Sequence, residues 1–232
     1  MTLMVLAQIA LGAIPSAAPI ADSETCYVLE RVKDGIPSEV GRTWQTVKAD
    51  RVDGQAVLRV LVHQRATSGG FDMKDVFVLR ADTLQPISFE NARNGERRVS
   101  LAYRARFVEG RRFEDDVWRS IQSELPDQIW EGNLFGVTFA GLPLEDGAEF
   151  ELPYFLHDKG LGVFEVEVTG SEIVETPDGP VEAWVVDFKR GDAVLITYLI
   201  AKEGRRELGY RGRNLIQRIG GDCSEIRDPR GA

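Results

Sequence analysis

The two histidines are the residues best suited to acid–base chemistry, because an imidazole gains and loses a proton near neutral pH. His157 precedes Asp158 and Lys159, and His63 is also followed by polar residues. Each histidine ends an apolar stretch, where polar residues are typical of a solvent-exposed turn. We therefore predict no catalytic residue and favour turn positions for both. The alternative is a hydrolase or isomerase that uses His157 or His63 with nearby carboxylates.

Other chemistry-bearing patterns are weak. Carboxylate pairs occur at Asp115/Asp116 and Glu145/Asp146, in polar contexts typical of the surface. The sequence lacks a nucleophile elbow, a phosphate-binding loop, a dinucleotide fingerprint, a zinc-protease helix motif and a calcium loop. Two cysteines and two histidines would all be needed for one structural zinc site. We expect no metal and no cofactor.

Arginines are concentrated in residues 85–113, which hold seven Arg and three Glu. Arg98, Arg104 and Arg106 have the same parity along a predicted strand, so they would lie on one face. Such a row can hold an anionic headgroup. The alternative, which we favour, is a solvated sheet face paired with nearby acids.

Aromatic residues cluster in the same part of the chain. Trp118 and Trp130 flank Pro126, and Phe135 and Phe139 follow. These four side chains can line the mouth of an apolar cavity that binds a ligand. Core packing without any ligand explains them equally simply and is the favoured interpretation.

The elements that must position these residues are strands. Gly-containing turns recur at hairpin spacing, as at Asp34-Gly35, Asp53-Gly54, Asn94-Gly95 and Asp178-Gly179. Between them, apolar and polar residues alternate, as in residues 101–107, 164–168 and 184–188. The one helical pattern spans residues 115–125, with Asp115 and Asp116 as its cap. We predict an all-β fold of about a dozen antiparallel strands in a strongly curved sheet or open barrel, with at most one or two short helices.

Two strands are apolar on both faces, residues 57–62 and 194–200. Such strands are covered on both sides. Either a lid segment packs outside them, which we favour, or they form the wall of a ligand cavity.

The chain ends indicate an exported protein. Residues 1–21 carry no charge and contain an apolar run followed by small residues, which is typical of a signal peptide-like segment. Residues 22–232 form a single predicted β domain with a short polar C-terminal tail. Cys26 and Cys223 lie near opposite ends of this domain, and in an exported protein a disulfide between them is expected. We predict a periplasmic or otherwise exported location.

Overall charge restricts the partners. The formal net charge of −9 is opposite in sign to the basic surface that general nucleic-acid binding requires. We therefore expect no nucleic-acid partner.

Several segments in order resemble a family of exported bacterial β-proteins of unknown function. They are residues 78–87, Leu142-Pro143-Leu144 with Gly147, residues 168–174 and residues 179–184. That family is distantly similar to the open barrels of periplasmic lipoprotein carriers. The resemblance implies a concave apolar face able to hold acyl chains, and it brings no catalytic residues.

The function predicted from these observations is non-enzymatic: binding of a hydrophobic or lipid-like ligand, or maintenance of the cell envelope. A structural β module that binds an envelope protein along a sheet edge is a further alternative.

Overall fold

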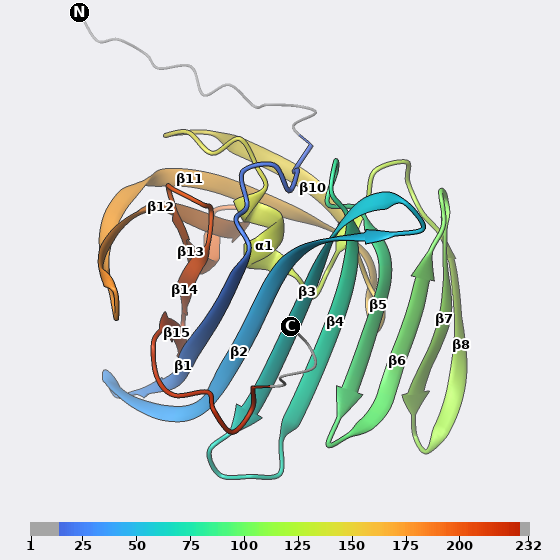
Figure 1. Cartoon of the computed structure of the whole chain (residues 1–232), viewed down its shortest axis with the longest axis horizontal. Coiled ribbons are helices and arrows are strands. Elements are labelled where there is room, and N and C mark those ends of the chain that lie inside the picture. The colour runs from blue at the N-terminus through green and yellow to red at the C-terminus, as the bar shows by residue number, and fades with distance from the viewer. Residues whose placement is uncertain (1–13, 228–232) are drawn as a thin grey trace, which may run out of the picture.

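The computed structural model describes residues 14–227 and contains one sheet of fifteen strands. Neighbouring strands are antiparallel, except that β9 and β10 are parallel. The sheet order is β8-β7-β6-β5-β4-β3-β2-β1-β15-β14-β13-β12-β11-β10-β9, so β8 and β9 are free edges and the sheet does not close (Figure 1). The strands are β1 (Ser23–Lys33), β2 (Ile36–Val52), β3 (Gln55–Ala66), β4 (Asp72–Arg80), β5 (Pro86–Arg93), β6 (Glu96–Tyr103), β7 (Phe107–Glu114), β8 (Val117–Glu124), β9 (Trp130–Glu131), β10 (Glu149–Leu156), β11 (Gly160–Thr176), β12 (Gly179–Arg190), β13 (Ala193–Ala201), β14 (Glu207–Gly212) and β15 (Leu215–Ile219).

The all-β prediction is confirmed, although about a dozen strands was an underestimate. The predicted helix over residues 115–125 is wrong, because residues 117–124 form edge strand β8. Asp115 and Asp116 do not cap a helix. They have φ values of 50° and 62° and form the two-residue turn between β7 and β8. Most of β8 is exposed, so its apolar residues show no period-two pattern that would have identified a strand.

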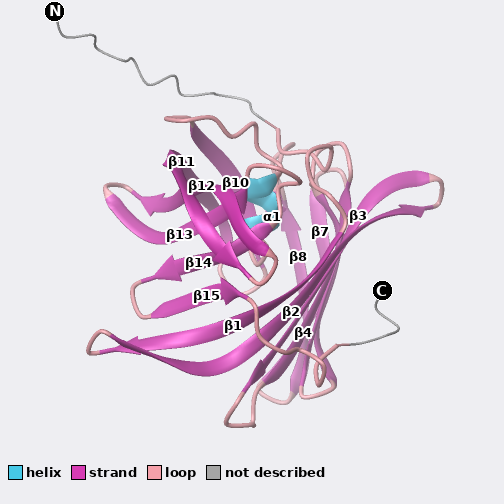
Figure 2. Ribbon diagram, turned by 60° about the vertical axis from the view of Figure 1, so that its left-hand side comes forward, coloured by secondary structure: helices cyan, strands magenta, loops and turns pink. Residues whose placement is uncertain are grey.

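The sheet curls until its two halves face each other, with helix α1 (Phe135–Ala140) between them (Figure 2). The main core fills this interior and draws on both halves. Phe77 and Phe89 stack with their ring centroids 5.0 Å apart on one side. On the other side, Phe164 packs edge to face against Phe139 of α1 at 5.5 Å. The concave face is thus largely packed with side chains.

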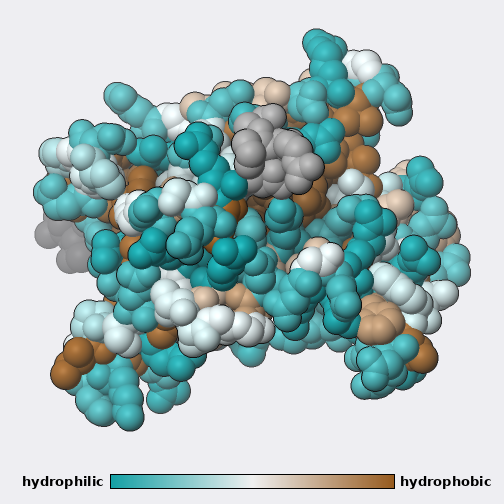
Figure 3. Space-filling model, turned by 60° about the horizontal axis from the view of Figure 1, so that its bottom comes forward, coloured by the Kyte–Doolittle hydropathy of each residue, from teal (hydrophilic) through white to brown (hydrophobic). Residues whose placement is uncertain are grey.

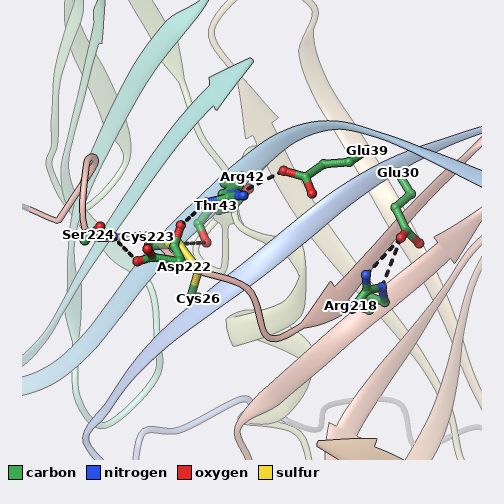
Figure 4. A network of polar contacts seen from close by, with 9 residues as sticks. All are labelled: Cys26, Glu30, Glu39, Arg42, Thr43, Arg218, Asp222, Cys223 and Ser224. Carbon is green, nitrogen blue, oxygen red and sulfur yellow. Dashed lines mark hydrogen bonds and ion pairs between the residues drawn. A yellow bond between two sulfur atoms is a disulfide. The ribbon is translucent and has the colours of Figure 1, made fainter. Parts of the chain in front are cut away.

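The C-terminal segment crosses the outer face of the sheet and is held by the predicted disulfide, Cys26–Cys223 (Figure 4). Arg42 donates a hydrogen bond to the carbonyl of Asp222 beside it. Trp44, Leu61, Cys223 and Ile226 then form a small outer cluster. This segment covers Leu61 on the outer face of the two-sided strand of residues 57–62.

His63 holds the same segment in place. Its Nδ1 lies 2.6 Å from the Ile226 carbonyl oxygen, and its Nε2 lies 2.8 Å from Asp72 Oδ1. Both partners are acceptors, so both bonds form only when each ring nitrogen carries a hydrogen. Arg65 also pairs with Asp72 at 2.6 Å. His63 is therefore a buried structural clamp rather than the turn residue that the sequence predicted.

The second two-sided strand, residues 194–200, lies in β13, and its C-terminal end is covered by the chain's own hairpin. Leu199 and Ala201 belong to a second apolar cluster with Tyr27, and Val174 and Val181 of the β11–β12 hairpin pack against it. The favoured lid interpretation therefore holds for Leu199, whereas Val194 at the start of the strand is 50% exposed.

Residues 14–21 lie against the domain, whereas residues 1–13 of the signal peptide-like segment are outside the described residues. The backbone amides of Ser16, Ala17 and Ala21 donate hydrogen bonds of 2.9 Å to Gly141, Ala81 and Gly204. Ala17 and Ile20 pack against the main core.

Figure 3 shows that hydrophilic residues cover most of the face it presents, as expected when the apolar side chains of a sheet are directed inward. Over residues 14–227, no helix has the length and apolar character needed to cross a bilayer. The same residues contain no group of three or more His, Cys, Asp and Glu side chains placed to bind a metal ion.

Candidate functional site

A pocket of about 570 Å³ lies between the two facing halves of the curled sheet. Strands β4 to β7 provide one wall, and the turn after β10 and the segment before α1 provide the other. Small-molecule sites have volumes of roughly 300–1,000 Å³, so this pocket is of a suitable size. Its lining residues are Met73, Asp75, Phe89, Asn91, Arg93, Asn94, Arg98, Val99, Arg112, Phe113, Glu114, Asn133, Phe135, His157 and Asp158.

The floor of the pocket is polar. Asp75 and Asn91 point inward from the neighbouring strands β4 and β5 and are 6% and 7% exposed. The Asn91 side-chain amide donates a 2.6 Å hydrogen bond to Asp75 Oδ1. Burial raises the pKa of Asp75 to about 6, against the opposing effects of this hydrogen bond and the charge of Arg93. Asp75 is therefore mostly ionised at neutral pH.

A second buried carboxyl group, Glu131, lies behind the floor. Tyr103 donates a hydrogen bond to Glu131 Oε2, and the side chain of Asn133 donates one of 2.9 Å to Oε1. Burial raises the pKa of Glu131 to about 7; its hydrogen bonds lower the pKa, whereas the charge of Asp75 raises it further. Asn133 thus connects this buried pair to the pocket surface.

His157 lies in the turn after β10 and contributes to the floor from the opposite side of the pocket. Its ring stacks on Phe89, with 6.0 Å between the ring centroids. Its Nδ1 is buried and has no hydrogen-bond partner. Burial lowers the pKa of His157 despite the adjacent Asp158, and Arg112 and Arg93 lower it further. The sequence correctly predicted a turn here, but the ring lines the pocket and its Nδ1 is buried instead of facing the solvent.

Three arginines surround the pocket opening. Arg112 donates a 3.1 Å hydrogen bond to the His157 carbonyl, which ties β7 to the turn after β10. It also pairs with Glu114 at 2.8 Å. Arg98 lies over the Phe113 ring at 4.7 Å and pairs with Glu96 at 2.6 Å. Arg93 is exposed, and its positive charge lowers the pKa of Asp75.

The pocket therefore combines three chemical features. The rim presents guanidinium groups, which bind carboxylates and phosphates. Phe89, Phe113 and Phe135 supply apolar surface. The floor presents a carboxylate, amides and an imidazole, which form hydrogen bonds. This arrangement can hold a small ligand that is partly apolar and partly anionic.

The predicted aromatic set does not act together at the pocket. Trp130 and Phe139 are 1% and 0% exposed and belong to the core, as favoured. Trp118 is 40% exposed on edge strand β8; it does not line the pocket but packs edge to face against Phe113, which does. Of the four predicted aromatic residues, Phe135 alone lines the pocket.

The predicted arginine row is not formed. Strand β6 ends at Tyr103 and β7 begins at Phe107, so Arg104 and Arg106 fall in the connecting turn. They pair with Glu109 and Asp127 on the surface, and only Arg98 lines the pocket.

Asp75, Asn91 and Asn133 were missed from the sequence, as were Arg93 and Arg112 as site residues. The sequence does contain a signal for Asp75 and Asn91. Asp75 has the same parity as Phe77 in β4, and Asn91 has the same parity as Phe89 in β5. A polar residue that interrupts a buried apolar face is a sign of a functional or buried polar site.

Comparison with known proteins identifies a family and a fold. Residues 27–213 match the family described as "Protein of unknown function (DUF3108)". No curated protein shows significant sequence similarity to the chain. A crystal structure of a beta-barrel-like protein of domain of unknown function DUF1849 from Brucella abortus is similar in fold, with a TM-score of 0.54 and 11% identity, over 93% of this chain and 100% of that one.

Proposed function

Because the chain belongs to the DUF3108 family of proteins of unknown function, we propose a function from its pocket. The protein binds a small amphipathic, lipid-like ligand that carries an anionic group. It does so as an exported, non-enzymatic protein of the cell envelope. The apolar part of the ligand lies against Phe113 and Phe135, and its anionic group contacts Arg93 and Arg112 at the rim.

One observation carries this proposal: aromatic and guanidinium groups line the same pocket of about 570 Å³. Apolar surface there contributes about 25 cal/mol per Å² removed from water. Each guanidinium adds charge-assisted hydrogen bonds to an anion. The packed interior leaves the pocket, rather than a long apolar tunnel, as the binding region.

The exported location rests on the disulfide. Cys26 and Cys223 are joined, and disulfides persist mainly in oxidising compartments. Fractionation of cells that express the full-length chain tests this part: we expect the protein in the periplasmic fraction with a mass two daltons below that of the fully reduced form.

The binding test has two stages. Native mass spectrometry of the protein purified without detergent is expected to show a retained lipid-sized mass. Calorimetric titration with decyl phosphate then measures affinity in three proteins: wild type, Arg93→Ala and Arg106→Ala. Arg106 is the matched control, because it is an exposed arginine outside the pocket. Loss of affinity in Arg93→Ala alone supports the proposal, whereas equal affinity in all three proteins overturns it.

Acid–base catalysis is a second candidate function, favoured by the unpartnered His157 Nδ1 in the same pocket as Asp75. Incubating the recovered ligand with the protein distinguishes the two functions. A change in ligand mass that disappears in His157→Phe indicates catalysis, and an unchanged ligand mass indicates binding.

A further inference from the structure

The floor of the pocket contains hydrogen-bonding groups that the protein itself does not satisfy. His157 Nδ1 is buried without a partner. Asp75 accepts a 2.6 Å hydrogen bond from Asn91, and a carboxylate has capacity for about four such bonds. Both residues line the same pocket, so their remaining capacity is directed at whatever occupies it.

We infer that the ligand carries hydroxyl groups beside its anionic group, and that these hydroxyls occupy the floor formed by Asp75, Asn91 and His157. The inference rests on the proposed function, because it specifies the polar part of the same ligand. The chemical class is a hydroxyl-bearing anionic head, as in a polyol or sugar phosphate. A hydroxyl both donates and accepts, so it can bond a carboxylate and an imidazole nitrogen at the same time.

The charges around the floor exclude the other simple occupants. An alkyl group there would leave His157 Nδ1 buried without a partner and Asp75 with the Asn91 hydrogen bond alone, which is costly. A second anion would lie against the Asp75 carboxylate. A cationic amine would lie near Arg93 and Arg112, whose charges already lower the pKa of His157. A neutral hydroxyl avoids all three penalties.

A matched pair of lipids tests this inference. Dihexanoyl phosphatidylglycerol and dihexanoyl phosphatidylpropanol have the same chains and the same charge, and they differ only in two hydroxyls. We expect the glycerol lipid to bind roughly tenfold more tightly to the wild-type protein, the effect of one or two added hydrogen bonds. In His157→Phe, which retains a ring to stack on Phe89, we expect this preference to fall to about twofold or less.

A second variant guards against misfolding of the first. Asp75→Asn is nearly isosteric and is expected to reduce the same preference, with circular dichroism confirming that both variants are folded. Equal binding of the two lipids to wild type, with Arg93→Ala still weakening both, overturns the inference and leaves the proposed function intact. Failure of both lipids to bind overturns the proposed function itself.

A third probe separates the two sources of such a head. If glycerol 3-phosphate, which has no acyl chains, binds as tightly as phosphatidylglycerol, the ligand is a free polyol phosphate and the lipid part of the proposal is overturned. Binding that is at least tenfold weaker supports a lipid, because the chains then contribute apolar contact.

Discussion

We expect a buried glutamate in the core to make the stability of this protein depend on pH. Glu207 lies on β14, is 7% exposed and accepts a 3.1 Å hydrogen bond from Gln217. Its carboxylate packs against Gly136 of α1, and a side chain at position 136 would collide with it. Burial raises the pKa of Glu207 from 4.5 to about 7, against the hydrogen bond from Gln217.

The direction of the effect follows from proton linkage. Between pH 4.5 and about 7, the folded protein binds a proton at Glu207 that the unfolded chain has released, so the free energy of unfolding falls as pH rises. Raising a carboxyl pKa from 4.5 to about 7 corresponds to roughly 3 kcal/mol. The destabilisation caused by ionising the buried Glu207 is absent below pH 4.5 and fully present above about pH 7.

Glu207→Gln removes the ionisation and keeps an oxygen that can accept the Gln217 hydrogen bond. We expect this variant to be about 1–3 kcal/mol more stable than wild type at pH 8.5 and to gain little at pH 4.5. Urea unfolding followed by tryptophan fluorescence at both pH values measures the difference. Glu151→Gln, at an exposed position of β10, is the control, and its difference in stability from wild type should be the same at both pH values. A Glu207→Gln effect that is equal at the two pH values would refute the reasoning.

Four further outcomes follow from the contacts described above. Replacing Cys26 and Cys223 by Ser, across a separation of 197 residues, should lower the free energy of unfolding by about 3–5 kcal/mol in urea titrations; a loss below about 1 kcal/mol would contradict this. A chain that begins at residue 22 should be roughly 1–3 kcal/mol less stable than one that begins at residue 14, because the packed residues 14–21 are lost; equal melting temperatures would show that this segment contributes nothing. Phe139→Ala should cost about 3–5 kcal/mol as a core cavity, and a near-neutral result in urea would exclude a core role. His63→Ala should speed hydrogen exchange and proteolysis at residues 224–227, and unchanged protection would mean that the disulfide alone holds the tail.

Much of the fold could be predicted because hairpins are encoded locally. Asn94-Gly95 takes positive φ at both residues and joins β5 to β6, as a two-residue turn requires. Val186 and Phe188 alternate along β12 and are both buried. Strand β8 was mistaken for a helix because it is an exposed edge, where no buried face imposes alternation.

The candidate site could not be assembled from local patterns. Phe89 and His157 stack although they belong to different halves of the sheet. Their contact depends on the accumulated twist and bend of all the strands between them, which the spacing of residues along the chain does not specify. Sequence reasoning therefore found His157 and Arg98 but placed neither beside Asp75.

The strand order has a consequence for how the chain acquires its structure. The first strand, β1, pairs with both β2 and the last strand, β15, at the centre of the sheet. Strands β2 to β8 can pair in succession as they are synthesised. The two halves of the sheet can join only when β15, residues 215–219, is available to pair with β1. Such long-range pairing slows folding and leaves an unpaired edge exposed in the meantime. Strands β1 to β8 are thus the part of the sheet that most needs protection from aggregation until β15 has been synthesised.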